Sequence, residues 1–293
     1  MEDYKLKPTI QWVGGKTRLL SEIINKIPKN IDNYHEIFLG GGTLLFSLCP
    51  SNAYCYELNE VLCIIYNCIK DNSDKLIEEL TKISDKYFEI PVTEKENRKK
   101  YYIDIRNKFN ILKLKEIKED NDKLNIAAYF KFINKTCFNA LYRENIKGGF
   151  NVPFGNGKDK VICDSENINK INKYFTSNNI IINNIDFEKS INNIKKGDFV
   201  YIDPPYYPLN EKSFTSYTKE GFHEKDHERL IKYCKKLNEM GVNFMLSNSN
   251  CDYIKNNFKE DCYTIKEISI SRTLNSEVSG RGKKKVEVII TNY

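Results

Sequence analysis

An apolar run, Phe199–Ile202, stops at Asp203, Pro204 and Pro205, and this junction constrains the fold more than any other stretch of the chain. A short apolar run that ends at two prolines is typical of a buried strand followed by a fixed, extended turn. In open α/β sheets, ligands bind in the crevice beyond the carboxyl ends of the strands. We therefore predict an α/β fold with a ligand site directly after residue 202.

The residues of this turn suit the binding of a planar exocyclic amine. The carboxylate of Asp203 can accept one N–H, the carbonyl of Pro204 can accept another, and the ring of Tyr206 can stack on a heterocycle. An amine held in this way turns its lone pair toward an electrophile. A plainer interpretation is also open, in which Asp203 caps a turn after a strand.

A second strand-to-helix junction, Glu36–Thr43, contains three successive glycines. Strand, glycine turn and apolar helix begin a Rossmann-like unit, and Gly40 and Gly42 let the backbone approach a ligand with no Cβ in the way. Because the spacing is neither GxGxxG nor that of a Walker motif, we expect a nucleoside-like cofactor. The next strand ends at Glu57, which either holds ribose hydroxyls or is an acidic residue at a helix N-terminus.

A third glycine-containing loop, Gln11–Lys16, enters a helical stretch near the N-terminus. Lys16 is either the partner of a ligand carboxylate or a solvated surface lysine. The loop by itself does not decide between the two.

Taken in order, these stretches resemble the Dam-type DNA adenine-N6 methyltransferases: a WxGGK-like start, an FxGGG-like loop, a central recognition region and then DPPY. The resemblance covers nearly the whole chain, and residues 90–125 are the least like the family. It implies a Rossmann-like core that binds S-adenosylmethionine (SAM), with an inserted helical DNA-recognition domain. It also implies methyl transfer from SAM to the N6 amine of adenine in duplex DNA, within GATC, after the base is flipped out.

The resemblance carries site residues over by position. The cofactor pocket is expected at Trp12, Lys16, Phe38, Gly40, Gly42, Glu57, Asp186, Phe187 and Asp203. Catalysis is expected at Asp203, Pro204, Pro205 and Tyr206. The family often has Asp where this chain has Glu57, and Phe187 has a second interpretation as a core residue.

DNA contacts are expected in the central region. By position they fall on Phe138, Asn139, Leu141, Arg143, Asn151 and Pro153. Arg143 is of the residue type that most often reads guanine. Phe138 is either an aromatic wedge where a base leaves the stack or a core residue. Gly157 replaces an aromatic residue usual in the family, a departure that bears on the sequence that is read.

We expect the catalytic core at residues 1–70 and 161–293, and a helical recognition domain with a β-hairpin at residues 71–160. Further strands are predicted at residues 180–182, 242–246, 263–270 and 286–291, from apolar runs between polar stretches. A polar loop over residues 271–285 separates the last two strands and is expected to meet DNA or to cover the site.

Composition permits DNA binding without proving it. The chain has 293 residues, 40% of them hydrophobic, with 46 basic and 40 acidic residues and a net charge of +6. Local basic runs that could attract phosphates lie at Arg98–Lys100, Lys147, Arg281 and Lys283–Lys285. The alternative for each run is a solvated face.

No metal site is expected. Nine cysteines form no CxxC pair. His223 and His227 are predicted on the outer face of a helix near residues 222–240. There is neither a signal peptide nor an 18-residue apolar run, so we expect a soluble, intracellular protein with free thiols.

Two other functions remain open at this stage. One is a DNA-binding protein of the same descent without catalysis, and the other is a methyltransferase that acts on RNA or single-stranded DNA. An intact recognition region favours duplex DNA as the partner. A cognate restriction endonuclease, acting as a separate protein, is left open.

Overall fold

The computed structural model describes residues 6–17, 19–209, 221–271 and 284–293. The chain divides into two compact units. Residues 1–15, 40–51 and 59–184 form the first, which we call the helical unit, and residues 16–39, 52–58 and 185–293 form the second, the sheet unit. Most of the loop expected at residues 271–285, and with it Arg281 and Lys283, lies outside the described residues.

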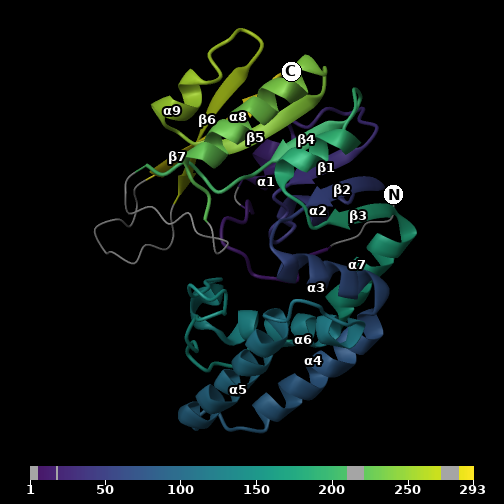
Figure 1. The fold of residues 1–293 in the computed structure, drawn as a ribbon, viewed down its shortest axis with the longest axis vertical. Helices are drawn as coiled ribbons and strands as arrows, with labels where there is room; N and C mark the ends of the chain where they lie inside the picture. Colours follow the sequence, from purple (N-terminus) through teal and green to yellow (C-terminus); the bar gives the residue numbers. More distant parts are fainter. Residues whose placement is uncertain (1–5, 18, 210–220, 272–283) are drawn as a thin grey trace. The chain divides into compact units, whose positions relative to one another are not determined.

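A seven-stranded, mostly parallel sheet has the order β3-β2-β1-β4-β5-β7-β6 (Figure 1). Its strands are β1 Tyr34–Ile37, β2 Asn52–Tyr56, β3 Asn179–Asn183, β4 Phe199–Ile202, β5 Asn243–Ser249, β6 Thr264–Ser271 and β7 Lys284–Thr291. β1, β2, β4 and β5 pair in parallel, and β7 runs antiparallel to both β5 and β6. The α/β fold class and the strands predicted from apolar runs are confirmed.

The register of the sheet aligns the ends of three strands. Ile37 of β1 lies opposite Tyr56 of β2 and Ile202 of β4. The residues that follow these strands, Phe38, Glu57 and Asp203, therefore start from one edge of the sheet. All residues of β4 are buried, as a strand covered on both faces requires.

Helices α1 (Leu20–Ile24), α8 (Glu224–Glu239) and α9 (Asp252–Asn256) and the 3-10 helix η2 (Phe187–Asn193) belong to the sheet unit. The apolar side of α8, with Leu230 and Leu237, shares a core with Val200, Ile202 and Phe244 of the strands.

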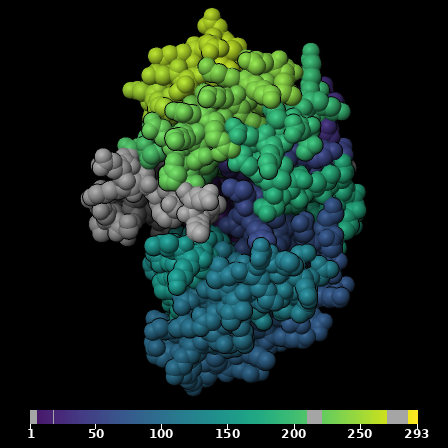
Figure 2. Space-filling model, in the orientation of Figure 1, coloured from purple at the N-terminus to yellow at the C-terminus, as the bar shows by residue number. Residues whose placement is uncertain are grey.

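The helical unit contains α2 (Thr43–Leu48), α3 (Glu60–Asp71), α4 (Ser73–Phe88), α5 (Lys95–Lys113), α6 (Asp120–Thr136), η1 (Phe138–Ala140) and α7 (Ser165–Ser177). α6 packs against α3, α4 and α5 and is buried over most of its length. In Figure 2, α4 and α5, coloured blue to teal, form a continuous part of the surface. The largely helical character predicted for residues 71–160 is confirmed. Within the described ranges, we find no helix with the length and apolar character that a membrane crossing requires.

The N-terminal segment of the helical unit is held in an extended form by side chains. The amide of Asn167 pairs with both backbone groups of Lys7, at 3.1 and 2.9 Å, and the amide of Asn134 pairs with those of Gln11, at 2.9 and 2.8 Å. Between them, the buried amine of Lys131 donates to the hydroxyl of Thr9. Side chains thus bind residues 7, 9 and 11 in the way a partner strand would, up to the residue before Trp12.

Lys131 should give the stability of the protein a distinctive pH dependence. Burial lowers its pKa to about 7, whereas the pKa of a lysine in the unfolded chain is about 10.4. Between these values the unfolded chain binds more protons, so the free energy of unfolding should rise with pH, by up to a few kcal/mol. In Lys131→Met this rise between pH 7 and pH 9, measured by urea unfolding, should be lost.

The matched control is Lys123→Met, which replaces a lysine of the same helix whose side chain is 46% exposed. It should keep the pH slope of the parent protein. An unchanged slope in Lys131→Met would contradict the role given to the buried amine.

Candidate active site

A pocket of about 230 Å³ opens in the sheet unit. Its lining is Phe38, Tyr56, Glu57, Leu58, Ile185, Asp186, Phe187, Gly221, Phe222, His223, Asp226 and Arg229. Four of the residues expected to bind the cofactor therefore meet here: Phe38, Glu57, Asp186 and Phe187. They come from segments far apart in the sequence because parallel strands deliver their carboxyl ends to one edge.

Aromatic rings form the apolar part of this pocket. The ring of Phe38 lies 5.4 Å from that of Phe187 and 5.8 Å, edge to face, from that of Phe222. Phe38 has a φ of 67°, an uncommon conformation for a residue other than glycine, at the exit from β1. Such rings suit the faces of a flat heterocycle. Phe222 carries no motif, so sequence reasoning missed it.

Charged side chains form the polar part. Arg229 of α8 donates to Asp186 at 2.7 Å and to Asp226 at 2.9 Å, and its guanidinium lies 4.9 Å from the ring centre of Phe187. Arg229 thereby fixes both the carboxylate and the ring that sequence analysis expected in the pocket. Glu57 lines the pocket, whereas Asn59 caps α3, with its side chain accepting from Val61 N at 3.0 Å. The alternative of Glu57 as the helix-terminal acid is therefore not favoured.

Lys16 and Asp203 form an ion pair in the sheet unit. The distance from Lys16 Nζ to Asp203 Oδ1 is 2.7 Å, and the side chains are 10% and 19% exposed. The ammonium also lies 4.7 Å from the ring centre of Tyr206. Lys16 is therefore no solvated surface residue. The carboxylate that it contacts here belongs to the chain itself.

The turn after β4 is anchored from β5 and β7. Tyr206 donates its hydroxyl to Glu287 at 2.9 Å, and Tyr207 N donates to Asn248 Oδ1 at 3.0 Å. Burial raises the pKa of Tyr206 well above its ordinary value, and the carboxylates of Asp203 and Glu287 raise it further, so the phenol stays neutral. Glu287 was missed by sequence reasoning, because nothing in its local sequence distinguishes it from a surface acid of a terminal strand.

The glycine turn meets Trp12 within the helical unit. A Cβ on Gly40 would lie 3.0 Å from the indole of Trp12, and one on Gly42 would lie 2.8 Å from the ring of Phe46. Both glycines have positive φ, 51° and 67°. The turn is therefore a close-packed backbone cradle that a larger residue would fill.

The expected DNA-contacting residues gather at one end of α6, also within the helical unit. Phe138 is 50% exposed and Leu141 is 36% exposed, so the core interpretation of Phe138 does not hold. Arg143 and Pro153 are exposed and Asn151 is half-buried, with Arg143 Nε donating to Asn151 Oδ1 at 2.7 Å. Asn139 has a φ of 52° and makes the bend between Phe138 and Leu141.

The placement predicted for His227 was wrong, whereas His223 is exposed at the start of α8, as expected. His227 is 1% exposed, between the rings of Phe222 and Tyr207, and His223 lines the pocket. Burial lowers the pKa of His227 to about 4, so its ring is neutral near pH 7. The buried side of α8 includes His227, although its neighbours in sequence, Asp226 and Glu228, are charged.

Comparison with known proteins defines the class. The family model of D12 class N6 adenine-specific DNA methyltransferases matches residues 12–274, and the chain belongs to this family. The family fold is the Rossmann-like core of SAM-dependent methyltransferases, and the chain is accordingly an adenine-specific, site-specific DNA methyltransferase that uses SAM.

Individual relatives align over almost their full length. The chain is 38% identical to the type II methyltransferase M.MjaIII of Methanocaldococcus jannaschii, over 99% of this chain and 100% of that one. It is 39% identical to the type II methyltransferase M1.LlaDCHI of Lactococcus lactis subsp. cremoris, over 98% and 96%. The DNA adenine methylase of Escherichia coli K12 is 25% identical over 99% and 96%.

Proposed function

We propose that this chain methylates the N6 amine of adenine within GATC in duplex DNA, on a base that has been turned out of the helix. The observation that carries the proposal is the turn after β4, where Lys16, Asp203 and Tyr206 lie in contact beyond a buried strand. A second segment, residues 141–154, supports the reading of base edges because it exposes Leu141, Arg143 and Pro153.

Asp203, Pro204, Pro205 and Tyr206 are proposed to hold the adenine. The Asp203 carboxylate and the Pro204 carbonyl accept hydrogen bonds from the two N–H groups of the amine, and the Tyr206 ring stacks on the base. The ammonium of Lys16 lies 2.7 Å from the Asp203 carboxylate and orients it, so the carboxylate is placed to stabilise the charge that develops on the amine. Glu287 fixes the phenol of Tyr206 and with it the plane of the ring.

The pocket residues fit a nucleoside that carries a sulfonium. Phe38 and Phe187 offer ring faces to an adenine, while Glu57 is positioned for ribose hydroxyls. Trp12, Lys16, Gly40, Gly42, Asp186 and Asp203 complete the proposed SAM-binding set. When bound, SAM supplies an electrophilic methyl group, and the chain contributes alignment and exclusion of water.

We propose that catalysis and target reading are divided along the boundaries expected from sequence. Residues 1–70 and 161–293 would form the catalytic core, and residues 71–160 would read the target. In that region Leu141, Arg143 and Pro153 are proposed to read bases, Phe138 to wedge into the stack, and Asn139 and Asn151 to support the contact. A separately acting restriction endonuclease is a partner to be tested, since two relatives are type II methyltransferases.

The target is tested by expressing the chain in a host that lacks adenine methylation and sequencing its DNA with detection of methylated adenine. We expect modified adenine in nearly every GATC and at background level elsewhere. Modification of a different sequence would refute the GATC assignment and leave the adenine reaction intact. Unmodified DNA from a host that makes folded, SAM-binding protein would refute the proposed reaction as a whole.

A further inference from the structure

Helix α5 carries a polar stripe along one side. Arg98, Tyr102, Arg106, Asn110 and Lys113 follow one another at intervals of four, four, four and three residues. This spacing places them on one helical face. The whole stripe lies within residues 90–125, the stretch least like the family, and neither the catalytic nor the cofactor assignments use it.

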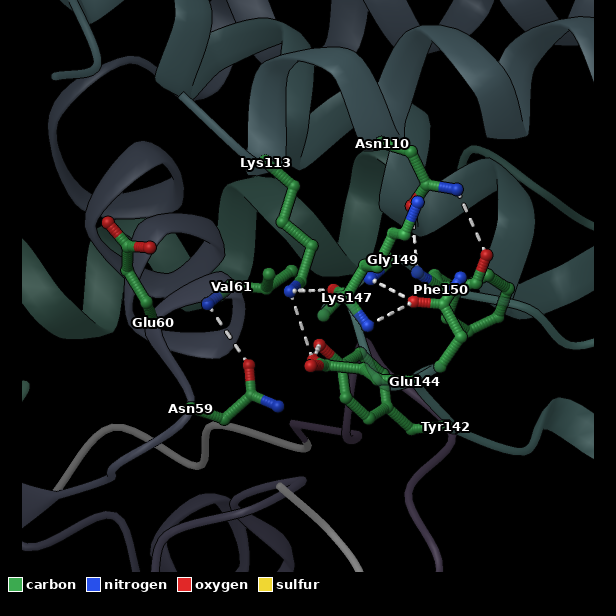
Figure 3. A network of polar contacts seen from close by, with 12 residues as sticks. Asn59, Glu60, Val61, Asn110, Lys113, Tyr142, Glu144, Lys147, Gly149 and Phe150 are labelled. Carbon is green, nitrogen blue, oxygen red and sulfur yellow. Dashed lines mark hydrogen bonds and ion pairs between the residues drawn. The ribbon is translucent and has the colours of Figure 1, made fainter. Parts of the chain in front are cut away.

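The stripe binds the backbone of one hairpin, from its turn at Gly148 along the arm that follows. Lys113 Nζ donates to Gly148 O at 2.6 Å, and Arg106 Nη1 donates to Val152 O at 3.1 Å. Between them, the amide of Asn110 pairs with both backbone groups of Phe150, at 3.0 and 2.8 Å (Figure 3). Side chains of a helix therefore supply hydrogen-bond partners to backbone groups of the hairpin that a further strand would otherwise pair.

This arrangement sets which side chains of the segment face outward. Phe150 and Val152, whose backbones α5 binds, are buried, whereas Asn151 and Pro153 alternate with them and are more exposed. Successive side chains of an extended segment point to opposite sides. Binding at residues 150 and 152 thus fixes the direction of Asn151 and Pro153, the two residues proposed to contact DNA.

Lys113 also joins the two arms of the hairpin. Its ammonium lies 3.1 Å from Glu144 Oε1, in a pair whose side chains are 14% and 11% exposed. Glu144 lies opposite Phe150 and accepts a hydrogen bond from Tyr142. The arm that carries Arg143 is in this way tied to the same residue of α5 as Gly148. Figure 3 shows Lys113 pointing toward Glu144.

We propose that Asn110 and Lys113 are positioning residues for target recognition. They hold the hairpin of residues 141–154 in its reading geometry before DNA arrives, so that binding does not bear the cost of ordering it. The proposal rests on the proposed DNA-reading role of Arg143, Asn151 and Pro153.

The test compares Asn110→Leu and Lys113→Met with two controls on the same helix, Asn107→Leu and Lys108→Met. Asn107 is exposed, and Lys108, at 51% exposure, contacts Asp104 instead of the hairpin. The probes are a short duplex with one GATC sequence, the same duplex with that sequence scrambled, and SAM. In both test variants we expect affinity for the GATC duplex to fall by about tenfold or more.

The same variants should bind SAM within about twofold of the parent protein, and their preference for the GATC duplex over the scrambled one should narrow. Lys113→Arg, which keeps a cationic donor, should recover part of the affinity. Equal losses in Lys113→Met and Lys108→Met would mean a general charge effect and would overturn the proposal. Parallel losses of SAM affinity and melting temperature would overturn it as well.

Hydrogen exchange in the absence of DNA gives a readout that does not depend on the target sequence. Amides of residues 141–154 should exchange faster in Asn110→Leu than in Asn107→Leu, while those of α3 and α6 stay unchanged. Unchanged exchange in the hairpin would overturn the positioning role. Failure of the parent protein to prefer the GATC duplex, with the exchange difference present, would instead count against the proposed target.

Discussion

Asp203→Ala should reduce methyl transfer to duplex DNA by more than about 100-fold, because a carboxylate aligned with the reacting amine is lost. The variant should still fold, since Asp203 follows β4 instead of lying within it and its side chain is 19% exposed. The measurement is transfer of labelled methyl groups from SAM to duplex DNA, with enzyme in excess over sites.

Asp261→Ala is the matched control, because Asp261 is an exposed aspartate of the same unit that precedes β6. Its transfer rate should stay within about twofold of the parent rate. Near-normal transfer by Asp203→Ala would refute the role assigned to this carboxylate. A variant that also lost its near-ultraviolet circular dichroism would not count as a catalytic effect, and Asp203→Asn would then replace it under the same criterion.

Arg98→Met should lower the free energy of unfolding by about 2–4 kcal/mol. Arg98 is 2% exposed and donates to Ile90 O and Gly157 O, each at 2.8 Å. Methionine fills a similar space but leaves the buried carbonyl of Gly157 and the partly buried carbonyl of Ile90 without this donor. The further bond to Asp159, whose side chain is 59% exposed, should contribute little.

The effect is measured by urea unfolding, next to Lys99→Met. Lys99 carries the same charge one residue further along α5, but its side chain is 47% exposed and contacts only Glu96 among the ion pairs of the described residues. That control should change the free energy of unfolding by less than about 0.5 kcal/mol. Similar stabilities for the two variants would show that the buried guanidinium contributes no more than a surface charge.

The basic run Arg98–Lys100 illustrates how far sequence reasoning reached. It was interpreted as phosphate-attracting or as a solvated face, and the two interpretations treated its members alike. The structure separates them: Arg98 is a buried structural residue, while Lys99 and Lys100 are exposed. A helix turns by about 100° per residue, so neighbours in sequence face different surroundings. No local pattern revealed which of the three would point inward.

The residues of the candidate active site were more predictable than the residues that hold them in place. Strand periodicity and turn chemistry located Phe38, Gly40, Glu57 and Asp203 at the ends of strands, because these features depend on local backbone preferences. Glu287, Arg229 and Phe222 were not predicted, since each meets the site only through packing of β7, α8 or the segment that precedes α8. The pairing of Lys16 with Asp203 likewise joins residues almost two hundred positions apart.

By itself, the sequence determined the α/β class, the turn at Asp203–Tyr206, the glycine turn and the family, because each depends on contiguous residues whose backbone preferences are local. The tertiary structure decided which cation faces Asp203, which carboxylate binds Tyr206, and that α5 rather than a strand supports the hairpin of residues 141–154. Those choices depend on contacts between distant segments, whose free energies come from burial and hydrogen-bond geometry that no short stretch of sequence contains.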